Sequence, residues 1–225
     1  MNTAKKAPVG QAAIPSQTSQ ASAAGSPIAY SADRLANQFL IAMPGMVDPN
    51  FAGSVIYLFE HTERGAMGLV INRPTELDMG ALFEKIEVKL EAEPVSEQPV
   101  YFGGPVQIER GFVLHEPMLE ADSDEKTNSI YASTLSVPGG LAMTTSKDVL
   151  EAMANGSGPQ RVLVTLGYAS WGEGQLESEI GENSWLTVAA DPVVIFDTPI
   201  EQRYDKALSL LGLQSWMLST QVGHA

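Results

Sequence analysis

Short, almost unbroken runs of Val, Ile, Leu and Phe recur along this chain and constrain its fold more than any other feature. Such runs are typical of β-strands that are covered on both faces. They predict strands over Phe39–Met43, Ser54–Phe59, Ala66–Ile71, Val100–Phe102, Gly111–His115, Val162–Leu166, Leu186–Ala189 and Val193–Phe196.

Helices are indicated by pairs of residues that match the spacing of a capping box, in which a side chain bonds the first free backbone N–H groups. The pairs are Thr75 with Asp78, Thr145 with Asp148, and Thr198 with Glu201. We expect a helix after each pair, the second over about Ser146–Ala154, and a further short helix over Gln175–Ile180. Because these helices do not separate the strands regularly, an α+β arrangement is favoured over a regular doubly wound sheet.

Composition divides the chain into two parts. Residues 1–33 consist mostly of Ala, Ser, Gln, Gly and Pro, and Lys5 and Lys6 are the only charged residues before Asp33. Pro and Gly interrupt the apolar stretch that a secretory signal would need, and the segment has too little apolar surface to offset the entropy lost on ordering. We therefore predict a disordered tail over 1–33 and one domain over 34–225.

Charge narrows the classes of partner. The chain has 13 basic and 27 acidic residues, a formal charge of −14, and no Cys. So acidic a surface repels phosphate backbones, and no direct nucleic-acid binding is expected. The lack of Cys excludes disulfides and thiolate chemistry, and no apolar run is long enough to span a membrane. We interpret Glu91–Pro99 and the acidic Glu120–Lys126 as surface loops; the second lacks the ligand spacing of a calcium loop.

Residues that could carry chemistry lie in glycine-punctuated segments. Gly103-Gly104 follows a predicted strand, where the glycines could expose backbone N–H groups to an anion or form a tight turn, the more ordinary interpretation. Asn72 is expected to bond its own backbone in a turn. Arg73 could bind a carboxylate or phosphate of a ligand, but such an Arg more often ties down a neighbouring acidic group.

Histidine provides weak catalytic candidates. His61 and His115 each lie beside a Glu at a strand end, where a neutral, hydrogen-bonded structural His is the ordinary case, and His224 lies near the C-terminus. No His pair has a helical ligand spacing, so no metal site and no cofactor are predicted. Ser170 does not lie in a nucleophile elbow.

The segment after Leu166 combines aromatic and acidic residues. On a helix over 175–180, Gln175 and Glu179 lie one turn apart while Glu177 points elsewhere, so a mechanism with paired carboxylates is disfavoured. Trp171 and Trp185 are more plausible as core anchors than as stacking platforms for a ligand.

Strand ends often gather ligand-binding groups on one rim of a sheet. We therefore expect a common cleft in which Arg73 or Arg110 holds an anionic group and His115 transfers a proton if chemistry occurs. Its expected ligand-binding residues are Asn72, Arg73, Gly103, Gly104, Arg110, Trp171, Gln175 and Glu177, with His61 nearby.

The same segments, in the same order, resemble the bacterial AlgH/YqgE family from about Leu35 to the end of the chain. The resemblance is carried by Phe39–Pro44, Gly65–Pro74, Gly103–Pro105 and the residues from Gly167 to Glu177. Ser170, Glu173 and Tyr204 depart from the family's usual Gly, Pro and Trp.

The resemblance implies a single α+β domain with a mixed, branched β-sheet that curls into a pseudo-barrel flanked by helices, in a cytoplasmic bacterial protein. It implies no reaction, because the family has no settled biochemical activity and its name derives from a genetic link to exopolysaccharide regulation.

Three functions are compatible with these residues. The first is a non-enzymatic regulatory or binding protein that acts through an unidentified protein or a small anionic ligand. The second is a hydrolase-like enzyme that acts on a small anionic metabolite through Arg and His residues. The third, a sequence-specific DNA regulator, is the least supported, because no predicted helix concentrates Lys and Arg.

Overall fold

Strand β9 (Val162–Gly172) lies at the centre of a ten-stranded sheet in the computed structural model, which describes residues 35–91, 95–118 and 130–218. One edge of β9 pairs antiparallel with β6 (Val106–His115). The other edge pairs parallel with β5 (Pro99–Phe102) in the first half of β9 and antiparallel with β3 (Gly65–Val70) in its second half. The sheet is therefore mixed and branches at β9, as predicted.

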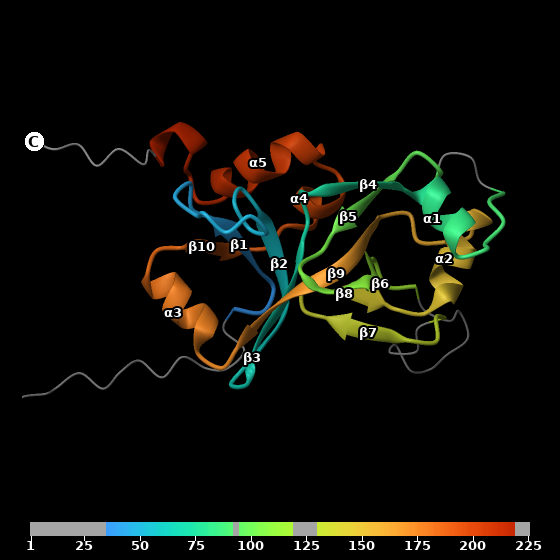
Figure 1. Cartoon of the computed structure of the whole chain (residues 1–225), viewed down its shortest axis with the longest axis horizontal. Coiled ribbons are helices and arrows are strands. Elements are labelled where there is room, and N and C mark those ends of the chain that lie inside the picture. The colour runs from blue at the N-terminus through green and yellow to red at the C-terminus, as the bar shows by residue number, and fades with distance from the viewer. Residues whose placement is uncertain (1–34, 92–94, 119–129, 219–225) are drawn as a thin grey trace, which may run out of the picture. The chain divides into compact units, whose positions relative to one another are not determined.

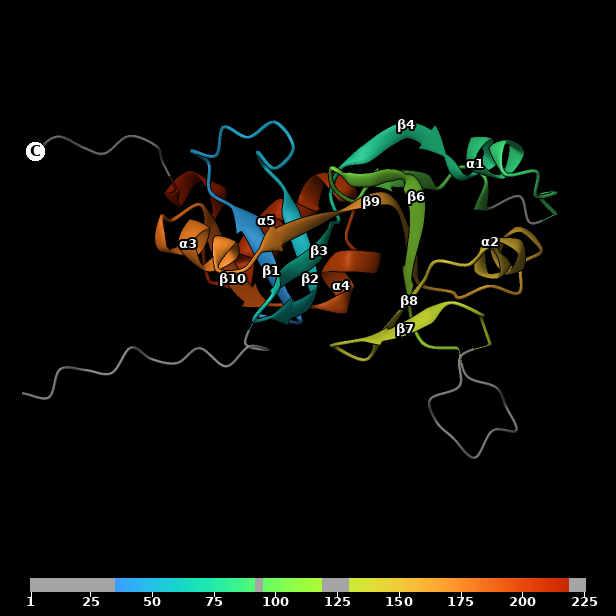
Figure 2. The same ribbon diagram turned by 60° about the horizontal axis from the view of Figure 1, so that its bottom comes forward.

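The remaining strands extend the sheet on both sides of β9. The strand order is β10-β1-β2-β3-β9-β6-β8-β7, and β4 pairs only with β5. These strands are β1 (Gln38–Ala42), β2 (Val55–Thr62), β4 (Pro74–Asp78), β7 (Thr134–Val137), β8 (Leu141–Thr144) and β10 (Trp185–Ala189). Figure 2 shows the sheet curling where β6 turns away from β9 towards β8 and β7. The expected curled sheet of a single α+β domain is confirmed.

Helices cover the sheet and bury its apolar faces. Helices α1 (Met79–Lys85) and α2 (Lys147–Ala154) lie at one end of the domain in Figure 1, and α3 (Gln175–Gly181) lies at the other. Helices α4 (Pro192–Phe196) and α5 (Arg203–Ser209) pack their apolar residues into a core cluster shared with β1, β2 and β3. Two 3₁₀ turns, η2 (Ile200–Gln202) and η3 (Ser215–Met217), flank α5 in sequence.

Most of the predicted strands are present. The prediction of a strand over Val193–Phe196 is wrong, because these residues form part of α4. The side chain of Asp191 accepts a hydrogen bond of 2.9 Å from the backbone N–H of Val193, and Pro192 occupies the first helical position. This cap and proline favour a helix start. They outweigh the β-propensity of the Val and Ile residues that follow.

The capping boxes correctly predicted that helices form nearby, but they did not predict which residues cap those helices. Asp78, not Thr75, caps α1, and its carboxylate accepts a 2.8 Å hydrogen bond from Ala81 N–H. Thr75 instead lies in β4 and donates to the carbonyl of Val100 at 2.8 Å. Thr198 donates its hydroxyl back to the carbonyl of Val193, so it caps no helix.

Helices α2 and α3 confirm the predicted helices in those regions, whereas β4, β7 and β8 were not predicted. The predicted tail over 1–33, the acidic segment Glu120–Lys126 and His224 lie outside the described residues. Within the described part of the chain, no helix is long and apolar enough to cross a membrane.

Candidate functional site

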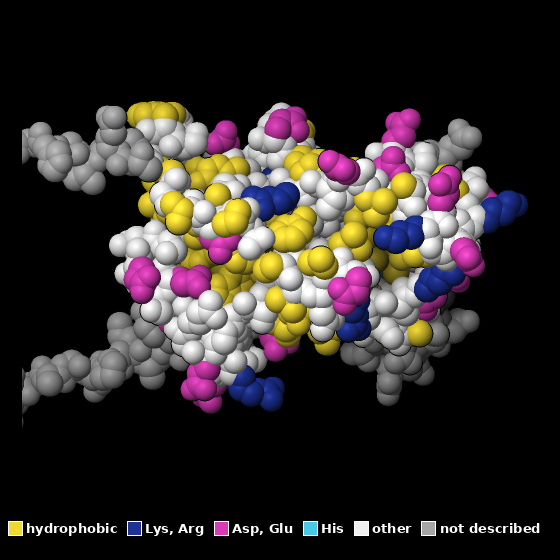
Figure 3. Space-filling model, in the orientation of Figure 1, with side chains coloured by type: hydrophobic (Ala, Val, Ile, Leu, Met, Phe, Trp, Pro, Cys, Tyr) yellow, Lys and Arg dark blue, Asp and Glu magenta, His cyan; other side chains and the backbone are white. Residues whose placement is uncertain are grey.

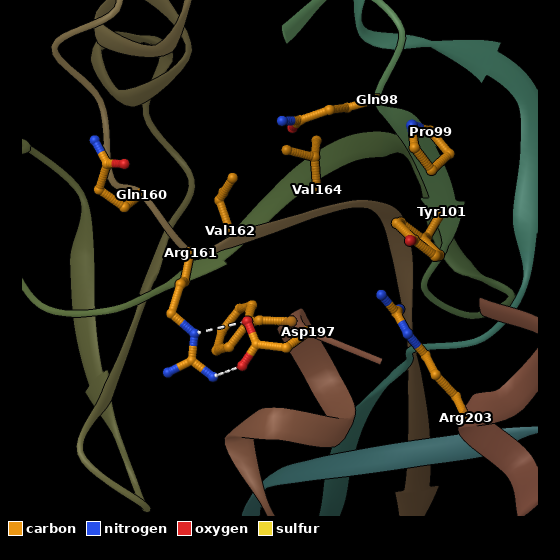
Figure 4. Close-up of a pocket in the computed structure, with 10 residues that line it drawn as sticks. Gln98, Pro99, Tyr101, Gln160, Arg161, Val162, Val164, Asp197 and Arg203 are labelled. Atoms are coloured by element: carbon orange, nitrogen blue, oxygen red, sulfur yellow. Dashed lines mark hydrogen bonds and ion pairs between the residues drawn. The ribbon is translucent and has the colours of Figure 1, made fainter. Parts of the chain in front are cut away.

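A hollow with a volume of about 280 Å³ opens beside β5, the start of β9 and the segment from α4 to α5 (Figure 4). Its walls combine two arginines and one aspartate with neutral polar and apolar side chains. The lining residues are Gln98, Pro99, Tyr101, Gln160, Arg161, Val162, Val164, Phe196, Asp197 and Arg203.

Arg203 is the most unusual residue of this hollow, because this charged residue is only 5% exposed. Its Nε donates a 3.0 Å hydrogen bond to the carbonyl of Thr198, and its Nη1 donates to the carbonyl of Ile71. No carboxylate in the described part of the chain pairs with this guanidinium. Burial lowers the pKa of Arg203 from its ordinary value, which shows the cost of holding a charge here, although the neighbouring Tyr101 partly opposes the shift.

The position of Arg203 follows from the periodicity of α5. Arg203, Ala207 and Leu208 are the buried residues of this helix, and Arg203 lies one turn before Ala207 on its buried side. An arginine therefore occupies a place where the helix otherwise presents apolar side chains to the core. Figure 4 shows its guanidinium beneath the ring of Tyr101, and the distance from Cζ to the ring centroid is 5.0 Å.

Arg161 lies on the opposite wall and, unlike Arg203, has acidic partners. Its Nε donates to Asp197 Oδ1 at 3.2 Å, its Nη2 donates to Asp197 Oδ2, and its Nη1 donates to Glu116 Oε1 at 2.8 Å. These hydrogen bonds, with Glu116 contributing most, raise the pKa of Arg161. The guanidinium also packs over the ring of Phe196 at 5.2 Å.

Tyr101 and two glutamines supply neutral polar groups. Burial raises the pKa of the Tyr101 phenol, with Arg203 opposing the shift, so the hydroxyl is protonated at neutral pH and can donate a hydrogen bond. Gln98 and Gln160 lie on the rim, and Val162 and Val164 form an apolar wall between them (Figure 4). The arrangement can hold a small anion whose body makes neutral polar and apolar contacts.

The residues predicted from sequence lie elsewhere, and Asn72 and Arg73 have structural partners. Asn72 accepts a 2.8 Å hydrogen bond from Val55 N–H and donates one of 2.9 Å to the carbonyl of Gly53. Arg73 donates to carbonyl oxygens of the loop between β1 and β2, at Pro49, Asn50 and Ala52. The expectation that Arg73 ties down a neighbouring acidic group is wrong, because its partners in the described residues are carbonyl groups of this loop.

Gly103 and Gly104 allow the backbone to approach β9 closely. A Cβ on Gly103 would lie 2.2 Å from the carbonyl oxygen of Gly167, and one on Gly104 would lie 2.1 Å from the carbonyl carbon of Tyr168. The N–H of Gly103 donates to the carbonyl of Leu166 at 2.8 Å. This N–H is thus used by the sheet, and close packing explains the glycine pair better than an anion cradle does.

His115 is fully buried, so the expectation that it faces a cleft is wrong. Its Nδ1 lies 2.7 Å from the carbonyl of Glu116 and its Nε2 lies 2.8 Å from Thr144 Oγ1. Nδ1 must therefore carry the proton, and Nε2 accepts from the threonine hydroxyl. Burial lowers the pKa of His115, against a smaller opposing effect of the Glu116 carbonyl, which favours the neutral ring.

Helix α3 arranges its acidic residues as predicted. Gln175 Nε2 donates to Glu179 Oε1 at 2.9 Å, whereas Glu177 points to the buried His61, with 2.8 Å between Oε1 and Nε2. Trp171 and Trp185 are both 3% exposed, which confirms them as core residues.

The expected common cleft does not form. Trp171 and Gln175 line a hollow of about 340 Å³ together with the loop after β1, whereas Arg110 lines a separate hollow of about 200 Å³ beside Phe112. Because the sheet curls, the ends of its strands do not lie along one continuous edge. The residues at these ends therefore line different hollows. Ligand binding by these residues remains a prediction.

Sequence reasoning missed Arg203, Arg161 and Tyr101, which line the Figure 4 hollow. The hydrogen-bond partner of Arg203 at Ile71 is 132 positions away in sequence, so no local spacing could reveal it. The one available signal was an arginine on the same helical face as Ala207 and Leu208, where an apolar residue is expected.

Comparison with known proteins assigns the chain to a family. A profile described as AlgH-like matches residues 39–216. The chain belongs to the AlgH-like family. Among curated relatives, a UPF0301 protein of Variovorax paradoxus is 63% identical over 191 residues, covering 85% of this chain and 96% of the relative. A UPF0301 protein of Cupriavidus metallidurans is 64% identical over 191 residues, covering 85% and 95%.

Solved structures agree with this assignment. The solution structure of the AlgH protein from Pseudomonas aeruginosa has a TM-score of 0.67 and 48% identity, covering 89% of this chain and 99% of that one. A crystal structure of a protein from Corynebacterium diphtheriae has a TM-score of 0.62 at 21% identity, covering 83% and 92%, and supports the fold alone. The resemblance to the AlgH/YqgE family is therefore confirmed.

Proposed function

We propose that this AlgH-like protein is a non-enzymatic binding protein that takes up a small anionic ligand in the hollow lined by Arg203, and that occupancy of this hollow is the basis of a regulatory role. The cytoplasmic location implied by the family resemblance is part of this proposal. The observation that carries it is the buried guanidinium of Arg203, which has no carboxylate partner in the described residues and faces a hollow of about 280 Å³.

A buried charge is unfavourable unless an opposite charge or several hydrogen bonds compensate it. Two carbonyl oxygens accept from Nε and Nη1 of Arg203, but they carry no formal charge. An anion in the hollow would supply that charge in a site where solvent screens it little, so the interaction would be stronger than at an exposed arginine. The ligand would complete a site that the protein leaves electrostatically uncompensated.

The enzymatic alternative has less support. The residues that line the hollow include no Ser, Thr, Lys or His that could act as a nucleophile paired with a base. His61 does pair with Glu177, but that contact joins β2 to α3 and neither residue lines the hollow. Nucleic acid is a poor candidate for the anion, because Lys and Arg side chains are scattered across the face shown in Figure 3 and not gathered in one patch.

Thermal unfolding with added anions tests the proposal. Monomethyl succinate should raise the melting temperature, because a ligand at a hundred times its dissociation constant adds about 2.7 kcal/mol to the free energy of unfolding. Arg203→Met should remove this shift, whereas Arg203→Lys should keep part of it. Arg110→Met is the matched control, since it removes an arginine that lines a different hollow. A shift that persists in Arg203→Met would contradict the proposal, and so would the lack of any shift in the wild-type protein.

A further inference from the structure

We infer that the Arg203 hollow selects a small organic molecule carrying a single negative charge and rejects dianions of the same size. This inference rests on the proposed function, since it specifies the ligand class of the same site. It follows from the charges that surround the hollow, which compensate one arginine completely and leave the other without an acidic partner.

The hollow offers a ligand one positive charge that is not already paired with a carboxylate. Arg161 is paired with both Asp197 and Glu116, so these three side chains together carry a net charge of −1. Arg203 is the other cation that lines the hollow, and none of the ion pairs in the described part of the chain includes it. A monoanion therefore meets a single uncompensated cation at Arg203, and a second ligand charge has no cation left to pair with.

Asp197 makes the second charge unfavourable as well as unpaired. It lines the same hollow as Arg203, and Figure 4 shows its carboxylate turned towards Arg161 on the wall opposite Tyr101. A dianion bound at Arg203 would place its other charge in a small space that already contains this carboxylate. Like charges at such separations repel by an amount that grows with the charge of the ligand.

Neutral groups make up the rest of the wall. The amides of Gln98 and Gln160 and the hydroxyl of Tyr101 can bond hydroxyl, ester or amide groups of a ligand. Pro99, Val162 and Val164 offer apolar surface. The volume of about 280 Å³ equals that of roughly nine water molecules at about 30 Å³ each, which suits a compact metabolite.

Two pairs of probes that differ mainly in charge test this inference. Monomethyl succinate and succinate share one carbon skeleton, and methyl sulfate and sulfate share one headgroup. Dissociation constants are measured by calorimetry at pH 7.5 and constant ionic strength. The monoanion of each pair should bind at least about tenfold more tightly than the dianion, which corresponds to about 1.4 kcal/mol.

Asp197→Asn provides the sharper test, because the side chain is 48% exposed and Arg161 keeps its bond to Glu116. Removing the carboxylate should tighten monoanion binding by about threefold. It should tighten dianion binding by about ninefold, because the Coulomb energy doubles when the ligand charge doubles. Glu173→Gln is the matched control. It removes one charge just beyond the far end of β9, roughly 30 Å along the strand from Val164 at about 3.3 Å per residue, and should leave all four constants unchanged.

The outcomes separate the two proposals. If dianions bind the wild-type protein as tightly as their monoanions, or if Asp197→Asn improves both equally, the charge selection is wrong while the anion site stands. If none of the four probes binds, both proposals fail. Monoanion preference that weakens in Asp197→Asn and persists in Glu173→Gln would establish the inference.

Discussion

Glu179 should stabilise the fold through the two buried tryptophans. Its Oε2 accepts hydrogen bonds from the indole Nε1 of Trp171 at 2.9 Å and of Trp185 at 2.8 Å. Its Oε1 accepts from the side-chain amide of Gln175 at 2.9 Å. One carboxylate thus satisfies the polar groups of two large side chains that are otherwise buried among apolar neighbours.

Glu179→Leu would leave both indole N–H groups without an acceptor. A buried unsatisfied donor costs about 1–3 kcal/mol, so the free energy of unfolding should fall by about 2–6 kcal/mol. Glu179→Gln keeps one carbonyl oxygen that can accept both indole N–H groups, and it loses the charge and the acceptor of the exposed Gln175 amide, so a smaller decrease of about 1–2 kcal/mol is expected.

Urea denaturation followed by tryptophan fluorescence measures both values. Trp216 is 70% exposed, so the variants are best made on a Trp216→Phe background in which the remaining signal comes from Trp171 and Trp185. Glu182→Leu is the control, because this exposed residue at the end of α3 should change stability by no more than about 0.5 kcal/mol. The reasoning is refuted if Glu179→Leu is no more destabilising than Glu179→Gln.

Other expectations follow from burial and charge. Trp171→Ala and Trp185→Ala should each lower the free energy of unfolding by about 3–5 kcal/mol in urea titrations, and near-wild-type stability would show that the ring is not a core residue. Because burial lowers the folded-state pKa of His115, the unfolded state takes up its proton first. Stability is therefore retained above the ordinary pKa of about 6.5 and decreases below it, by up to about 1.4 kcal/mol per pH unit. His115→Gln should lack this part of the pH dependence, and an unchanged slope would contradict it. Duplex DNA should not bind at physiological salt, and a submicromolar complex in a gel-shift assay would overturn this expectation.

Hydrophobic runs predicted the central strands because burial on both faces leaves a strong local pattern. β6 and β9 extend beyond their predicted ends, into Val106–Arg110 and Gly167–Gly172, where exposed residues and glycines interrupt the run. β4 has no fully buried residue, and its alternation between exposed and half-buried side chains gave no apolar signal. Local propensity failed at Val193–Phe196, where the Asp191 cap decides the conformation.

The site could not be predicted from the sequence because its defining property is long-range. Arg73 and Arg203 look alike as single arginines near turns, yet Arg73 donates to three carbonyl groups of the loop between β1 and β2, whereas Arg203 is buried beside a hollow. What distinguishes them is burial, because Arg203 is 5% exposed whereas Arg73 is only partly buried, and burial is a property of the assembled domain. Spacing along α3, by contrast, was sufficient to predict the contact between Gln175 and Glu179.

The most direct measurement of the central claim is an NMR titration of the arginine Nε–Hε signals in ¹⁵N-labelled protein with monomethyl succinate. The Arg203 signal should shift saturably, and the signals of Arg73 and Arg110, which belong to other parts of the surface, should move little. A saturable shift at Arg73 or Arg110 with no change at Arg203 would contradict the account, and so would the absence of any shift at a ligand concentration of tens of millimolar.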